Sequence, residues 1–168
     1  MNVKRCLVAA AGLLAGTAWA DPAPAEIRLR DADLEGLMGV KSGLSLVATF
    51  DVKRENLYDE LVLDFYLLLE PRDKNLTPQF FHCRTVHRFL EEETGYTSGV
   101  GLSPAVMECI QPRSGRYAVI ATYRGAEVGV ENSEKERWWE GEQLGRPIEN
   151  VLTRSTGASV VRTWESDE

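Results

Sequence analysis

The sequence predicts an all-β protein, an antiparallel β-sandwich of the immunoglobulin-like kind with one or two short helical turns. Short runs of alternating apolar and polar residues recur along the chain, with turn residues between them. No strand–helix–strand alternation appears, which argues against a parallel α/β sheet. The longest such run, residues 57–71, has one face that is apolar without interruption, as a strand facing a core requires.

The run 57–71, LYDELVLDFYLLLEP, is the predicted centre of the sheet. Side chains alternate across a strand, so one face is wholly apolar and the other is mixed. Pro71 ends the run before a polar turn, which favours a strand over a helix. We therefore expect a central strand with one face on the core. The apolar face consists of Leu61, Leu63, Phe65, Leu67 and Leu69.

The other elements are expected in chain order on either side of this run. Ser103 and Pro104 form an N-cap and first-turn pair, which predicts a short helix over 104–110. Gly125 supplies the turn of a hairpin over 116–130. The segment 96–102 is either a strand or an irregular edge, because its glycines weaken it. Further strands are predicted at 27–31, 44–52, 78–90, 148–153 and 159–164.

The first twenty residues have the pattern of a signal peptide. Lys4 and Arg5 precede an apolar stretch over 7–18, and Ala18-Trp19-Ala20 fits a signal peptidase site. We expect a signal peptide over 1–20, a single β-sandwich domain over 21–168, and export to the periplasm or beyond the cell. No second apolar stretch reaches the roughly 20 residues of a spanning helix, so no membrane span is predicted.

The chain is acidic, with a formal net charge of −7, and loss of the two basic residues of the signal peptide makes it more negative. An acidic surface disfavours binding to nucleic acid and to anionic lipid. The expected partner is an unknown protein or carbohydrate, which the sequence does not identify further.

Of the three cysteines, Cys83 and Cys109 follow the signal peptide. An even number of cysteines in an exported chain favours a disulfide, so we predict that these two are bridged. The alternative is two separate buried thiols.

No residues form a recognisable catalytic or metal-binding set. On a strand, Cys83 and His87 lie about 13 Å apart and His82 points to the other face, so no metal ion is predicted. No Gly-x-Ser-x-Gly motif accompanies the two histidines. The acidic run 91–93 is expected to be a solvated loop. We therefore predict no cofactor and no catalytic residue.

The most unusual feature is the pair Trp138-Trp139. On an extended segment one indole would face the core and the other would face solvent, where it could form a binding surface. The alternative is that the second indole packs over a sheet edge or under the loop 141–147.

These observations favour an exported, non-catalytic β-sandwich that acts as a binding or structural module. One alternative is a small secreted hydrolase that uses paired carboxylates on glycans, which requires two carboxylates facing each other across a cleft. Another is a protease inhibitor, for which the loop 141–147 is the candidate contact segment.

Overall fold

The structure, a computed structural model, describes residues 26–37, 43–154 and 159–160. The predicted signal peptide lies outside the described residues. The strands are β1 Glu26–Glu35, β2 Leu44–Lys53, β3 Leu61–Pro71, β4 Gln79–His87, β5 Glu93–Leu102, β6 Pro112–Tyr123, β7 Ala126–Asn132, β8 Thr153–Arg154 and β9 Ser159–Val160. The helices are α1 Pro104–Ile110 and the 3-10 turns η1 Trp138–Glu140 and η2 Glu142–Leu144.

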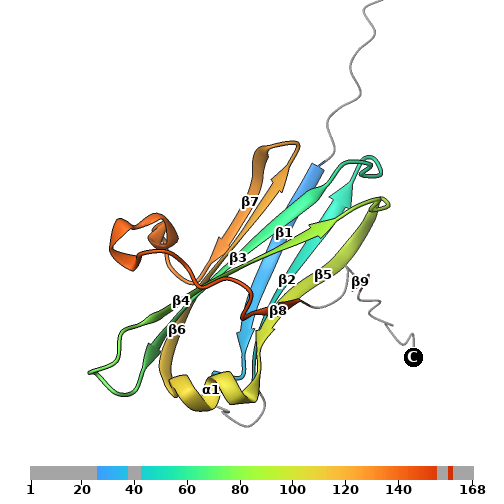
Figure 1. Cartoon of the computed structure of the whole chain (residues 1–168). Coiled ribbons are helices and arrows are strands. Elements are labelled where there is room, and N and C mark those ends of the chain that lie inside the picture. Colours follow the sequence, from blue (N-terminus) through green and yellow to red (C-terminus); the bar gives the residue numbers. More distant parts are fainter. Residues whose placement is uncertain (1–25, 38–42, 155–158, 161–168) are drawn as a thin grey trace, which may run out of the picture.

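The strands form two antiparallel sheets that face each other (Figure 1), as the all-β prediction requires. One sheet has the order β1-β2-β5-β8, with β9 also paired to β5. The other has the order β4-β3-β6-β7, so β3 lies between two neighbours and is central, as predicted. The hairpin of β6 and β7 and the Ser103-capped helix α1 are also confirmed.

The main core fills the space between the two sheets. The five apolar residues predicted for the inner face of β3 are all 0% exposed. They pack in one cluster with the inward side chains of β2, among them Leu46 and Phe50. The alternation that predicted these strands therefore also predicted which of their faces is buried.

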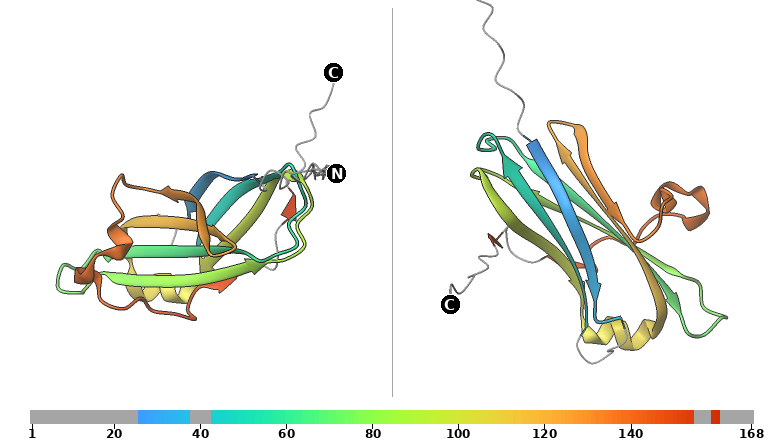
Figure 2. Two further views of the ribbon diagram at one scale, coloured as in Figure 1. Left: turned by 90° about the horizontal axis from the view of Figure 1, so that it is seen from above. Right: turned by 180° about the vertical axis from the view of Figure 1, so that it is seen from behind.

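The two long edges of the molecule are closed differently. Along one edge β1 lies beside β7 (Figure 2), and a Cβ added to Gly129 would lie 3.0 Å from the Cβ of Leu29. Glycine thus permits this close approach. Along the other edge, the segment 148–154 runs from β4 to β5. Ile148 exchanges backbone hydrogen bonds with Phe80 and His82, and Thr153 and Arg154 pair with β5 as β8.

The outer face of β3 is also covered, which the sequence analysis did not predict. Leu68, Phe80, Ala118 and Trp139 form a second buried cluster there. Trp138 and Trp139 lie in the 3-10 turn η1, so the prediction of an extended segment with oppositely directed indoles was wrong. Both indoles pack on this face. In a 3-10 turn, with three residues per turn, the side chains of adjacent residues do not point in opposite directions as they do on a strand.

The predicted Cys83–Cys109 disulfide was also wrong, since both cysteines are free thiols. Cys83 lies in the middle of β4 opposite Phe65. Cys109, on α1, lines a hollow together with Gln79, at the start of β4. Cys83 lies four residues further along the strand than Gln79, or about 13 Å away, whereas bridged cysteines have Cα atoms under about 7 Å apart.

Some boundaries differ from the predictions near the chain ends. The first strand, β1, runs ten residues and extends beyond the predicted end at residue 31. The strands predicted at 148–153 and 159–164 shorten to the two-residue β8 and β9 within the described residues. Segment 96–102 belongs to β5, which lies between β2 and β8 and so is not an edge. The described helices are all too short or too polar to cross a membrane.

Candidate functional site

Three connections meet at one end of the molecule (Figure 1): residues 54–60 between β2 and β3, residues 88–92 between β4 and β5, and the turn 124–125 between β6 and β7. We call this the loop-end surface. It exposes two large aromatic side chains, Tyr58 at 72% and Phe89 at 75%. Exposed aromatics that gather in one place mark candidate interaction sites more often than scattered ones do.

The connections of the loop-end surface are held to one another by specific contacts. The backbone N–H of Leu57 donates to the carbonyl of Leu90 at 2.6 Å. The backbone N–H of Glu92 donates to Oδ1 of Asn56 at 2.7 Å. Arg124 of the third connection pairs with Asp59 at 2.5 Å. Tyr58 and Phe89 directly adjoin the bridged leucines, so their backbones are fixed before any partner arrives.

Phe89 has an unfavourable backbone conformation for its residue type. Its φ is +56°, in the left-handed region that L-residues with a side chain rarely adopt. The sequence predicted a strand over 78–90 that includes Phe89, but β4 ends at His87 and Phe89 points to solvent. A left-handed residue costs about 1–2 kcal/mol. An exposed phenylalanine gains little burial to offset that cost.

The loop-end surface is acidic. Its connections and the start of β5 carry Glu55, Asp59, Glu60, Glu91, Glu92 and Glu93 against Arg54, Arg88 and Arg124. Each of the three arginines already pairs with a carboxylate, namely Glu26, Glu60 and Asp59. The surface therefore combines apolar aromatic area with uncompensated negative charge.

A polar cluster lies beneath this end, between the sheets. Nε2 of His87 lies 2.9 Å from Oγ of Ser98 and 3.3 Å from Oγ1 of Thr85. All three residues are buried, with Ser98 1% exposed. Burial lowers the pKa of His87. A serine beside a histidine is the arrangement of a nucleophile and its base, but a buried Ser98 hydroxyl is out of reach of a substrate. The motif search missed this pair because it forms only across the two sheets.

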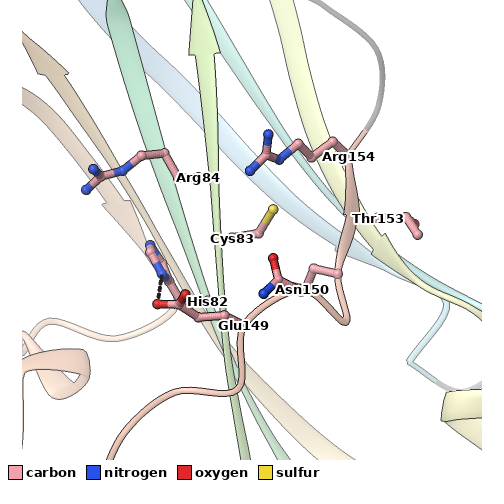
Figure 3. A pocket seen from close by; sticks show the side chains of 8 residues that line it. His82, Cys83, Arg84, Glu149, Asn150, Thr153 and Arg154 are labelled. Atoms are coloured by element: carbon pink, nitrogen blue, oxygen red, sulfur yellow. Dashed lines mark ion pairs between the residues drawn. The ribbon is translucent and has the colours of Figure 1, made fainter.

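A cleft with a volume of about 480 Å³ opens between β4 and the segment 148–154 (Figure 3). Its walls are His82, Cys83 and Arg84 from β4, and Glu149, Asn150, Leu152, Thr153 and Arg154 from the segment. In Figure 3 the side chains of Asn150 and Arg154 point from the segment toward the thiol of Cys83.

Beside the cleft, Asp64 of β3 organises the polar side chains of β4. Arg84 donates two hydrogen bonds to its carboxylate, at 2.8 and 3.0 Å, and Nε2 of His82 donates a third at 2.8 Å. Burial by itself raises the pKa of Asp64, but the hydrogen bonds and charges of His82 and Arg84 outweigh it and lower that pKa. The same pairing raises the pKa of Arg84. Nδ1 of His82 lies 3.7 Å from Glu149.

The residues singled out in the sequence thus lie in different parts of the fold. His82 belongs to the outer face of β4, whereas Cys83 and His87 belong to its inner face, and the described residues contain no group of three metal-ligating side chains. Trp139 is buried, and Trp138 is partly buried beside Arg116. A binding role for the Trp138–Trp139 pair stays a prediction.

No family model and no curated protein matches the chain. Among solved structures, it is similar to a crystal structure from Akkermansia muciniphila, with a TM-score of 0.59 and 17% sequence identity. The match covers 75% of this chain and 80% of that one. At this identity the likeness concerns the fold alone.

Proposed function

We propose that the protein is an exported, non-catalytic β-sandwich of the immunoglobulin-like class that binds a protein partner through the loop-end surface. The class is supported by the strand order. If β1 to β7 are labelled A, B, C, C′, E, F and G, with no D strand, the sheets contain A-B-E and C′-C-F-G. C′ then joins the sheet of G, F and C, as it does in variable-type immunoglobulin domains.

The position of the loops supports the same class. In variable domains, the loops that contact the ligand lie at one end of the sandwich and include B–C and F–G. Here the corresponding connections are 54–60 and 124–125, which both belong to the loop-end surface together with 88–92. Tyr58 lies in the connection that corresponds to B–C, and Phe89 lies in the neighbouring connection 88–92.

The observation that carries the proposal is Phe89. A glycine would adopt its φ of +56° without strain, and the phenyl ring is 75% exposed. The side chain therefore has no evident benefit for folding that outweighs its backbone cost. Residues that cost stability without packing are expected at functional positions.

The acidic charge of the loop-end surface and the burial of the hydroxyls beside His87 favour binding of a basic partner over catalysis. The acidic loops favour a partner whose contact surface combines an apolar centre with lysine or arginine, because complementary charges speed association and exclude wrong partners. The hydroxyls that hydrogen-bond to His87 are buried, which supports binding over hydrolysis. Export, which the pattern of residues 1–20 suggests, would place the partner in the bacterial envelope or outside the cell.

The test compares the mature wild-type protein with two variants, each used to capture proteins from the envelope of the bacterium that produces it. Phe89→Gly removes the exposed ring and relieves the backbone. Leu76→Ala removes an exposed side chain in the turn between β3 and β4, at the opposite end. We expect one captured protein to be lost with Phe89→Gly and retained with Leu76→Ala, and its capture to weaken with salt.

The free energy of unfolding of the variants shows whether a loss of capture comes from a lost contact or from a lost fold. Phe89→Gly should leave the free energy of unfolding unchanged or raise it by up to about 1 kcal/mol, because relief of strain outweighs the added chain entropy of glycine. Equal capture by Phe89→Gly and wild type would refute the role of the loop-end surface.

A further inference from the structure

The segment 148–154, which we call the strap, is attached at both of its ends. Ile148 donates its N–H to the carbonyl of Phe80 at 2.7 Å and accepts from the N–H of His82 at 3.1 Å. At the other end, Oγ1 of Thr153 donates to the carbonyl of Gly101 at 3.1 Å. Between them, Leu152 is 5% exposed and belongs to the main core. The cleft of Figure 3 is therefore a formed feature with two fixed walls.

The cleft contains one cation, Arg154, that is not engaged by a carboxylate of the described residues. The guanidinium of Arg154, the side-chain amide of Asn150 and the thiol of Cys83 lie together in it (Figure 3). No ion pair engages Arg154 within the part of the chain that the structure describes. The carboxylate of Glu149 lies 3.7 Å from Nδ1 of His82, and that of Asp64 is occupied by Arg84 and His82. Neither is paired with Arg154.

The backbone of the strap bends at Asn150. Its φ is +65°, and Asn is among the residue types that tolerate this left-handed conformation. The side-chain amide of Asn150 faces Cys83, with its oxygen nearer to the thiol than its nitrogen (Figure 3). The amide of Asn150, whose NH2 group can donate after rotation about the last side-chain bond, is thus carried by a fixed, bent backbone.

We propose that this cleft binds a small oxyanion, a carboxylate or phosphate group, with Arg154 as its charged anchor and Asn150 as a second donor. Guanidinium matches both groups with two parallel hydrogen bonds. The volume of about 480 Å³ lies within the roughly 300–1,000 Å³ of small-molecule sites. This site is separate from the loop-end surface and does not depend on its function.

The test is a titration of the isotope-labelled mature protein, followed by the backbone amide signals in NMR spectra. Inorganic phosphate and succinate serve as separate probes. We expect saturable shifts of signals from residues 82–84 and 149–154 with at least one of them. Saturation by phosphate alone indicates a phosphate ligand, and saturation by succinate alone indicates a carboxylate.

Arg154→Gln should weaken the binding by about tenfold or more, whereas Arg72→Gln should leave it unchanged. Arg72 is an exposed arginine in the turn between β3 and β4, so it controls for the loss of one positive charge. Thermal unfolding of both variants checks that they are folded. If neither probe gives saturable shifts, or if both variants bind like wild type, the proposal is overturned.

Discussion

His87 places an imidazole between the two sheets, where protonation is disfavoured. Its ring lies 5.9 Å from that of Phe50, and its hydrogen-bonding partners Ser98 and Thr85 are neutral. Burial lowers the pKa of His87 in the folded protein. The unfolded chain, with a histidine pKa near 6.5, therefore binds more protons than the folded chain as the solution is acidified.

His87 should accordingly make the protein less stable in acid. Its contribution is complete above about pH 6.5 and is lost as the pH falls below that value, at up to about 1.4 kcal/mol per pH unit. Urea unfolding at a series of pH values measures this slope. His87→Gln should reduce the slope, whereas Thr85→Val, which keeps the imidazole, should not. An unchanged slope in His87→Gln would assign the pH dependence to other groups.

The two cysteines should differ in reactivity rather than form a bridge. Cys109 is exposed and Cys83 is buried. A thiol-alkylating reagent should modify Cys109 quickly in the folded protein and Cys83 only slowly, as read by intact-mass spectrometry of the wild type and of Cys109→Ser. A mass two protons lower in the untreated, non-reduced protein than in the reduced protein would instead show a disulfide.

At the scale of elements, η1 acts as a cover on the outer face of the second sheet. The ring of Trp139 lies 6.5 Å from that of Tyr66, and the ring of Trp138 lies 6.0 Å from that of Phe80. This cover explains why the outer side chain of Leu68 is only 2% exposed. The sheet is thus buried on both faces at β3, next to the cover.

Truncation of the two tryptophans should separate their roles in this cover. Trp139→Ala should lower the free energy of unfolding by roughly 3–5 kcal/mol, the usual cost of removing a buried aromatic ring. Trp138→Ala should cost less, because Trp138 is only partly buried. Chemical denaturation of both variants measures the two losses in the free energy of unfolding. A larger loss for Trp138→Ala would mean that the cover packs differently.

The elements that the sequence predicted well are those whose two faces differ in polarity. β2, β3 and the β6–β7 hairpin alternate cleanly, and the Ser103-Pro104 pair marks the start of α1. The Trp138–Trp139 turn was missed because two adjacent apolar residues fit a strand or a turn equally well. The pairing of Cys83 and Cys109 depended on distance in the fold, which composition does not contain.

The candidate sites were missed for a related reason. The loop-end surface brings together three connections that are far apart in sequence, and Phe89 fell within the strand predicted over 78–90. Its positive φ follows from where β4 ends, which the alternating pattern did not show. The cleft likewise needs the strap to cross from β4 to β5.

At the scale of the whole molecule, the two proposed sites lie on different parts of one scaffold. The loop-end surface occupies the tip formed by three connections, whereas the cleft lies along the edge between β4 and β5. Both rest on backbone held by the sheets, so each can be altered without disturbing the core. This separation makes the protein suited to variants that lose one function and keep the fold.

The most direct measurement of the central claim is photo-crosslinking in the cells that produce the protein. A photoreactive phenylalanine analogue is placed at Phe89, and in a second strain at Leu76, at the opposite end of the sandwich. The loop-end account predicts a discrete crosslinked protein from position 89 that is absent from position 76 and diminishes with a Tyr58→Ala substitution. Identical products from both positions, or none from position 89, would contradict it.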